Sequence, residues 1–264
     1  MPIGIVYIEV NRMCELFAAS LRKPSAVNGY LKRFYSHSIN HPHGWGLACI
    51  NKDNVIIEKE PQRADKSYYL KERLSVPVSA PIVLAHIRYA TIGHIKYENC
   101  HPYTGKDKFG RAWTLIHNGT IFDYPQLGSY RQEQSGDTDS ERVLLHIIDS
   151  INKNHAQTPK ERIETITSTI EKLSPGNKLN LILFDGEQMY VHTNYKNSLY
   201  YIDTEEGIFI STTPLDDIGW VNVPFTRVLV YKDSELIFTG KNHGNEYVDN
   251  IEDTKYLYQI FSDL

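Results

Sequence analysis

The chain has 264 residues, 41% of them hydrophobic and 23% charged, and a formal net charge of −4. This composition is typical of an ordinary soluble globular protein, and the weak negative charge excludes the broad basic surface with which many proteins bind nucleic acid. Three scattered cysteines offer neither a disulfide framework nor a CxxC pair, and no run approaches the ~18 apolar residues of a membrane span. The opening residues lack the basic start of a signal peptide, so we expect a cytoplasmic protein without a membrane segment.

The N-terminal half alternates short apolar runs with polar turns. Ser25 is predicted to cap a helix that runs to Tyr35, because its apolar residues fall on one face. The stretch 91–112 is rich in Gly, His and Lys and is predicted to be a long loop of the kind that often carries function. Strands are predicted over residues 4–8, 16–19, 45–50, 55–60, 82–90 and 113–117.

Two helices are predicted in the middle of the chain. Residues 140–152 repeat apolar positions at helical spacing behind a cap at Thr138 or Asp139, and residues 158–173 begin with a capping box. Further strands are predicted over residues 179–185, 188–194, 198–202, 207–212, 226–231 and 234–238. This order indicates an α+β fold in which two sheets pack face to face between helices, in one domain.

Several polar residues stand where buried strands end. Arg88 closes an apolar strand, where it either pairs with an internal carboxylate or binds the carboxylate of a ligand with its flat guanidinium. Asn118 and Gly119 close another strand; the glycine either allows a tight turn, or both residues offer N–H donors to an oxyanion. Two aspartates at 137 and 139 either cap a helix or bind an ammonium group. The histidines show no metal-ligand spacing, so no metal site is predicted.

Cys14 is the candidate nucleophile, and its position after Met13 decides whether it can act. If the preceding residues are removed, Cys14 carries a thiol and a free α-amine, and this amine has a reference pKa of ~7.7–8 that suits a general base. If they remain, the Cys14 nitrogen is an amide and cannot accept a proton. The Met-Cys pair can equally be a chance feature of the sequence.

Seven short motifs follow one another along the chain: Cys14-Glu15-Leu16, HGWG at 43–46, AHIRYAT at 85–91, ENCHPYT at 98–104, HNGTI at 117–121, GDTDSE at 136–141 and STTPL at 211–215. Together, and in this order, they resemble the class II glutamine amidotransferases, which are N-terminal-nucleophile hydrolases. The resemblance is greatest to the stand-alone, single-domain members of that family and extends from Met13 to about residue 238.

The resemblance implies a four-layer αββα fold, with two mainly antiparallel sheets between helices, and hydrolysis of glutamine to glutamate and ammonia without a cofactor. By motif position, Cys14 is the nucleophile, and Asn118 and Gly119 form the oxyanion hole. Binding of the substrate falls to Arg88 at its carboxylate and to Asp139 at its ammonium group, with Thr91 and His101 lining the same pocket.

Residues 1–13 are then an N-terminal extension, either a leader or the product of a misassigned start codon, and residues 14–264 form a single amidotransferase-like domain. We expect ammonia to pass to a separate synthase subunit or to be released by simple hydrolysis. Two alternatives stay open. The substrate can be a γ-glutamyl peptide or thiol in place of glutamine, or the chain can be an inactive binding or regulatory subunit whose N-terminus is not processed.

Overall fold

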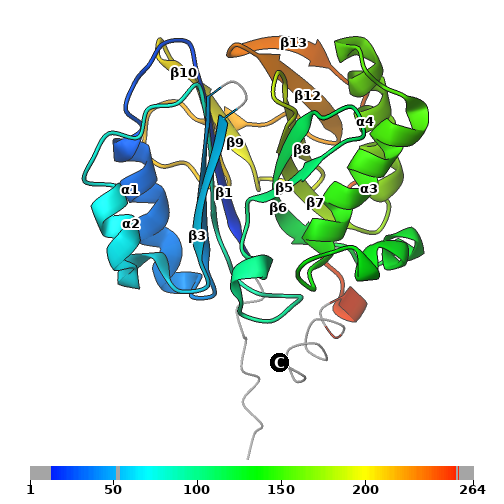
Figure 1. Cartoon of the computed structure of the whole chain (residues 1–264), viewed down its shortest axis with the longest axis horizontal. Coiled ribbons are helices and arrows are strands. Elements are labelled where there is room, and N and C mark those ends of the chain that lie inside the picture. The colour runs from blue at the N-terminus through cyan, green and yellow to red at the C-terminus, as the bar shows by residue number, and fades with distance from the viewer. Residues whose placement is uncertain (1–12, 52–53, 254, 256–264) are drawn as a thin grey trace, which may run out of the picture.

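The computed structural model describes residues 13–51, 54–253 and 255, and these residues form two stacked sheets with helices on both outer faces (Figure 1). The pairings within both sheets are antiparallel. The predicted four-layer αββα arrangement is confirmed. The predicted strand over residues 4–8 lies outside the described residues.

The first sheet has seven strands, in the order β11-β9-β10-β1-β4-β2-β3. Their bounds are β1 Glu15–Leu21, β2 Trp45–Asn51, β3 Asn54–Glu60, β4 Ile82–Ile87, β9 Tyr200–Asp203, β10 Gly207–Ser211 and β11 Val221–Asn222. The second sheet has six strands, in the order β13-β12-β8-β7-β6-β5. Their bounds are β5 Tyr103–Lys106, β6 Ala112–Thr120, β7 Lys178–Phe184, β8 Met189–Thr193, β12 Arg227–Lys232 and β13 Glu235–Thr239.

Two pairs of helices cover the sheets, α1 and α2 on the first and α3 and α4 on the second (Figure 1). Their bounds are α1 Asn28–Ser36, α2 Tyr68–Arg73, α3 Asp139–Asn154 and α4 Pro159–Leu173. Short 3₁₀ turns cover η1 His37–Asn40, η2 Ala64–Lys66, η3 Tyr97–Asn99 and η4 Pro125–Gln132.

The alternation of side chains along β1 shows why the layers stack. Phe17 and Ala19 pack into the core beneath α1 and α2, whereas Leu16 and Ala18 pack into the core between the two sheets. Because both faces of the strand are covered, its central residues 16–19 are all apolar. A third core lies between the second sheet and α3 and α4.

The caps predicted for the two central helices are confirmed. The Thr138 hydroxyl accepts a hydrogen bond from the Glu141 N–H at 3.2 Å, and Thr158 and Glu161 form the reciprocal bonds of a capping box. These bonds satisfy N–H groups that have no partner within the helix.

Other predictions about the elements were wrong. Ser25 does not cap α1, which begins at Asn28 after Val27 and has no side-chain cap; the Asn28 side chain instead binds the backbone around Val78. The predicted loop 91–112 contains η3 and strand β5, and the strand predicted over 82–90 ends at Ile87. Helix α2 and strand β11 were not predicted.

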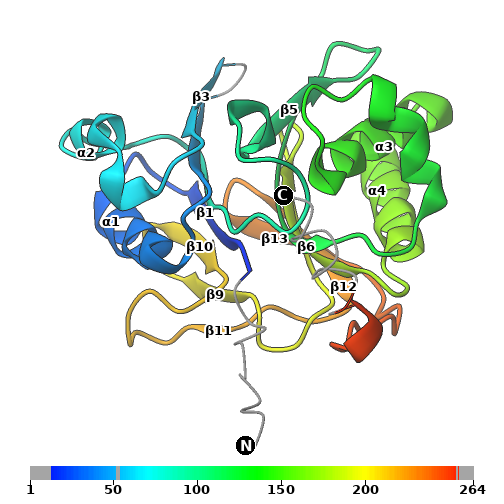
Figure 2. The same ribbon diagram turned by 90° about the horizontal axis from the view of Figure 1, so that it is seen from below.

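The two sheets bring several chain segments together at one edge. Glu15 at the start of β1 pairs with Ile87 at the end of β4, and the Ile121 N–H just after β6 binds Asp139 at the start of α3. Residues 240–253 return to the six-stranded sheet, where the Tyr247 N–H binds the Asn194 carbonyl at 2.8 Å. Figure 2 shows the molecule from this side, with the start of β1 facing the second sheet.

Candidate active site

Cys14 lies immediately before β1, and the end of β4 fixes its thiol. The Tyr89 N–H donates to Sγ at 3.4 Å, and Sγ lies 3.3 Å from the Tyr89 carbonyl oxygen. Burial raises the pKa of the thiol to about 11, although the Tyr89 backbone and the charge of Arg88 oppose this rise and Asp139 adds to it. The Cys14 thiol is therefore protonated at neutral pH and lies within electrostatic reach of both charged residues.

The residues after Cys14 are held by a segment almost 200 positions away. Thr212 accepts the Leu16 N–H at 3.0 Å, and Thr213 donates to Glu15 at 3.4 Å. Glu15 also binds the His37 ring at 2.8 Å and raises the pKa of His37. These contacts join the CEL and STTPL motifs and fix the start of β1.

Arg88 is buried just beyond β4, and backbone carbonyls surround its guanidinium. Its two Nη atoms donate to the carbonyls of Ile92, Gly93 and His94 at 2.9–3.0 Å. In the described part of the chain it forms no ion pair, so the internal Arg–carboxylate pair weighed from the sequence is not found there. Arg88 therefore shapes the 92–94 loop, and half-buried Thr91 begins this loop.

His101 lies in a stack of buried rings. Its ring centroid is 4.0 Å from that of His86 and 4.6 Å from that of Tyr103. Both of its ring nitrogens are buried, and neither has a hydrogen-bond partner in the part of the chain that the structure describes. Burial lowers the pKa of His101 well below its ordinary value, so the ring is neutral and offers one donor and one acceptor.

Asn118 and Gly119 lie near the end of β6. The Asn118 side chain is buried, and among the described residues its Oδ1 has no hydrogen-bond partner. A Cβ at Gly119 would lie 1.9 Å from the Lys178 carbonyl oxygen on the neighbouring strand β7. Close packing of the two strands, rather than the tight turn considered from the sequence, therefore excludes any side chain here.

Asp139 begins α3 and binds two backbone N–H groups. Its Oδ2 accepts from Ile121 at 2.8 Å, and its Oδ1 accepts from Ser140 at 2.9 Å. Each carboxylate oxygen has two lone pairs, so the side chain retains acceptor capacity. These contacts therefore leave Asp139 able to bind an ammonium group, which was the alternative to a helix cap.

Asp137, in contrast, binds residues of the 92–99 loop. Its carboxylate accepts from the His94 N–H at 3.1 Å and from the Asn99 amide, and it pairs with Lys96 at 3.1 Å. Burial alone would raise the pKa of Asp137, but the bonds from His94, Asn99 and Lys96 outweigh it and lower the pKa to about 2. The loop that surrounds Arg88 is therefore tied to the start of α3.

Cys14 and Asn118 open onto a common cavity of about 630 Å³. Arg88, Thr91, His101 and Asp139 are not among the residues that line it. Lys178, which was not predicted as a site residue, contributes a buried ammonium group to the cavity. The full lining is Met13, Cys14, Glu15, Asn40, His41, Asn118, Lys178, Asn180, Tyr195, Lys196, Asn197, Ser198, Thr212 and Thr213.

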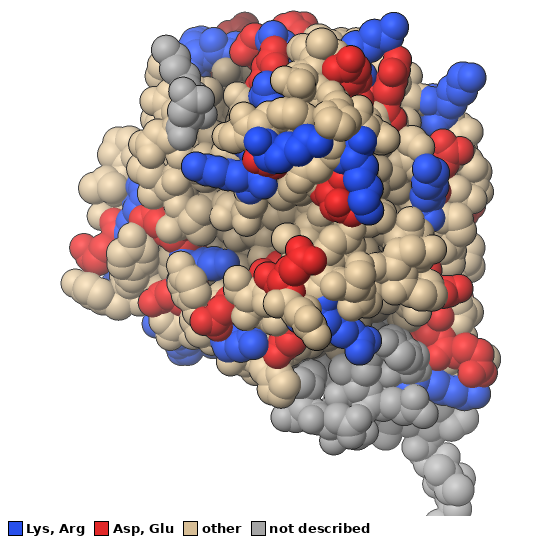
Figure 3. Space-filling model, turned by 45° about the vertical axis from the view of Figure 1, so that its right-hand side comes forward, with Lys and Arg blue, Asp and Glu red and all other residues tan. Residues whose placement is uncertain are grey.

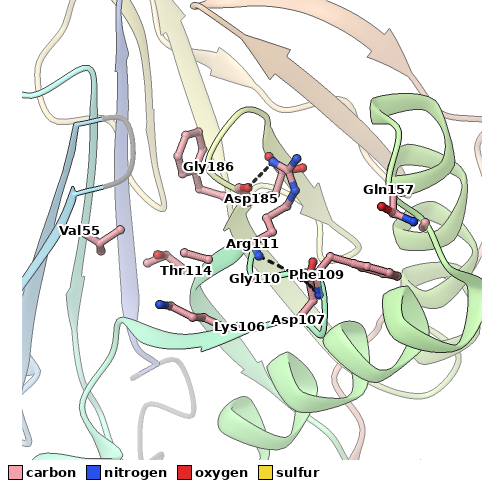
Figure 4. Close-up of a pocket in the computed structure, with 13 residues that line it drawn as sticks. Val55, Lys106, Asp107, Phe109, Gly110, Arg111, Thr114, Gln157, Asp185 and Gly186 are labelled. Carbon is pink, nitrogen blue, oxygen red and sulfur yellow. Dashed lines mark hydrogen bonds between the residues drawn. The ribbon is translucent and has the colours of Figure 1, made fainter.

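A second cavity, of about 510 Å³, has a different lining (Figure 4). Two of its charged side chains bind the backbone: Arg111 donates to the Asp185 carbonyl at 3.0 Å, and Asp107 accepts from the Arg111 N–H at 3.0 Å. On the face of the molecule shown in Figure 3, acidic and basic side chains are interspersed.

The described residues contain no group of three or more His, Cys, Asp or Glu side chains placed to hold a metal ion. Among the helices in that part of the chain, none has the length and apolar character needed to cross a membrane.

Comparison with known proteins gives consistent matches. Uncharacterized protein MJ1515 of Methanocaldococcus jannaschii is 26% identical over 256 residues, and the match covers 87% of this chain and 72% of that protein. "Putative glutamine amidotransferase YafJ" of Escherichia coli is 29% identical over 242 residues, covering 89% of this chain and 92% of that protein.

A solved structure of "the allosteric regulatory enzyme of purine biosynthesis" superposes with a TM-score of 0.67 at 18% identity, covering 88% of this chain and 49% of that one. At this identity the likeness concerns the fold alone. The model of the class II glutamine amidotransferases matches residues 13–207. The chain therefore belongs to the class II glutamine amidotransferase family.

Proposed function

We propose that the protein hydrolyses the side-chain amide of glutamine, with Cys14 as the nucleophile once residues 1–13 have been removed. One observation carries the proposal: the Cys14 thiol is fixed at the end of β4, shares a cavity with Asn118, and is reached by the charges of Arg88 and Asp139. This arrangement combines a thiol, an amide donor and one group of each charge.

The free α-amine of Cys14 would take the proton of the thiol, which burial otherwise keeps protonated. The thiolate sulfur then attacks the amide carbon, and the Asn118 side-chain N–H and the Gly119 backbone N–H stabilise the oxyanion. The C–N bond breaks as the nitrogen receives the proton, and ammonia leaves. Water hydrolyses the resulting thioester and releases glutamate.

The opposite end of glutamine would bind on the loop side of Cys14. Arg88 takes the α-carboxylate while its bonds to residues 92–94 hold the surrounding loop, and Asp139 takes the α-ammonium group. Thr91 and the neutral ring of His101 complete this pocket. Ammonia then passes to a separate synthase subunit or is lost to water, and we place the reaction in the cytoplasm.

The test is ammonia release from glutamine by protein whose intact mass shows Cys14 as its first residue. Cys14→Ala should abolish release, because no other described group is placed to attack from this position. Cys49→Ala, which removes a buried free cysteine on β2, is the matched control and should retain activity. Full activity in Cys14→Ala would exclude the proposed nucleophile.

One observation supports the inactive alternative. The Met13–Cys14 peptide bond makes the Cys14 nitrogen an amide, which cannot act as a base. A chain that retains residues 1–13 should bind glutamine without releasing ammonia.

A further inference from the structure

The cavity next to Cys14 is larger than the release of ammonia requires. Its volume of about 630 Å³ is that of a small-molecule site. The groups proposed to bind the α-carboxylate and α-ammonium of glutamine, Arg88 and Asp139, do not line it. The cavity therefore lies on a side of Cys14 and Asn118 that Arg88 and Asp139 do not line. The group that leaves the γ-carbonyl carbon would occupy this side.

Lys178 gives this cavity its chemical character. The side chain is buried at the start of β7, and its Nζ lies 3.5 Å from the centre of the Tyr195 ring. In the described part of the chain, Lys178 Nζ pairs with one carboxylate, that of Asp249, at 3.7 Å. The Asp249 side chain is itself half exposed. Burial lowers the pKa of Lys178 to about 8, and Asp249 only partly opposes this effect. A buried ammonium group with one long ion pair is incompletely compensated.

The other lysine of the cavity differs in this respect. Lys196 is exposed and pairs with Glu246 at 2.9 Å, so its charge is already balanced. Neutral amide and hydroxyl side chains also line the cavity: Asn40, Asn180, Asn197, Ser198, Thr212 and Thr213. Glu15 also lines the cavity, but its carboxylate already binds the His37 ring at 2.8 Å. Lys178 is therefore the under-compensated charge of the cavity, and an ammonium group in this state suits a carboxylate.

We propose that this cavity is a leaving-group subsite and that Lys178 binds a carboxylate on the amine portion of the substrate. The inference rests on the proposed function and deepens it: the preferred substrate is a γ-glutamyl amino acid or peptide. In the acylation step the γ-carbonyl C–N bond breaks, a thioester forms on Cys14, and the amino acid leaves with the proton. Water then releases glutamate. An amino acid acting as acceptor in the reverse step would occupy the same subsite.

Binding tests the subsite without turnover. The full chain carrying Cys14→Ala is titrated calorimetrically with γ-glutamylglycine and with γ-glutamylethylamide, which has a methyl group in place of the carboxylate. We expect about tenfold tighter binding of γ-glutamylglycine, the order of one charge-assisted contact. Adding Lys178→Met, which keeps the length of the side chain and removes its charge, should reduce the ratio to about twofold or less. Lys106→Met, at the second cavity, is the matched control and should leave the ratio unchanged.

Equal affinities for the two ligands, or a ratio that survives Lys178→Met, would overturn the subsite. Turnover separates this failure from that of the proposed function. Cys14-dependent hydrolysis of both compounds with equal kcat/KM would leave the chemistry intact and refute the subsite. Selective binding of γ-glutamylglycine by protein that hydrolyses neither compound would support the subsite and refute the chemistry.

Discussion

Substitution of Gly119 by alanine probes the oxyanion hole through the packing of two strands. The added Cβ would lie 1.9 Å from the Lys178 carbonyl oxygen and 2.6 Å from His117 Nε2. Real Cβ contacts essentially never fall under 3.0 Å, so β6 and β7 would have to separate by about 1.1 Å at this point. A displacement near 1 Å in a catalytic site can lower the rate about 10²-fold, and loss of one oxyanion donor lowers kcat about 10²–10³-fold. We therefore expect Gly119→Ala to lower kcat by about 10²–10³-fold.

The same strain should lower stability by about 1–3 kcal/mol, the usual cost of overpacking. Ammonia release is followed with a coupled glutamate dehydrogenase assay, and stability by urea unfolding. Gly29→Ala is the matched control: a Cβ there meets no atom within 4 Å, so activity should be unchanged and stability equal or up to about 1 kcal/mol higher. Gly119→Ala with the native rate and the native urea midpoint would refute both the packing argument and the role of the Gly119 N–H.

Three further predictions concern the Cys14 amine as base, Arg88 as the binding group for the substrate carboxylate, and the 92–99 loop that Asp137 holds. With a free Cys14 amine as base, kcat/KM should fall as the pH drops below ~7.7–8, because the protonated amine cannot accept the thiol proton; a profile flat down to pH 6 would contradict this. Arg88→Lys keeps the charge but loses the planar fork, so KM for glutamine should rise by about tenfold or more, measured by steady-state kinetics; an unchanged KM would remove Arg88 from substrate binding. The pKa of Asp137 is lowered to about 2, so its stabilising contribution is complete above the ordinary value of about 3.9 and is lost as the pH falls toward 2. Asp137→Asn should therefore flatten the dependence of urea stability on pH between about 4 and 2 and raise KM; an unchanged slope would show that the carboxylate does not hold the loop.

The layers were predictable because the apolar pattern is clear in the long central helices and in the buried strands. In α3, Val143, Leu144, Ile147, Ile148 and Ile151 recur at helical spacing, and all are buried. The apolar run 16–19 in β1 likewise marks a strand covered on both faces. Local pattern and tertiary burial agree in these elements, so sequence alone was enough.

The missed elements owe their structure to partners elsewhere in the chain. Helix α2 has six residues and buries only Leu70, which leaves no periodic signal. Strand β5 forms because Tyr103–Lys106 pairs with β6, although its sequence reads as a loop. Ser25 was assigned as a cap because the competing contact of Asn28 with the backbone near Val78 cannot be read from neighbouring residues.

The candidate site was partly predictable for the same reason. Short motifs pointed to Cys14, Arg88 and Asp139, and the structure places Arg88 and Asp139 within electrostatic reach of Cys14. Lys178 stands at the head of an apolar strand, where a lysine usually reaches solvent. Its burial depends on Tyr195 and Asp249, which lie 17 and 71 residues further along the chain.

The intact mass of the protein made from its own gene, measured together with the ammonia release of the same preparation, tests the central claim most directly. The account predicts a chain that begins at Cys14 and releases ammonia from glutamine. A chain that retains residues 1–13 and releases ammonia at the same rate would contradict it, because the amide nitrogen of Cys14 cannot serve as the base.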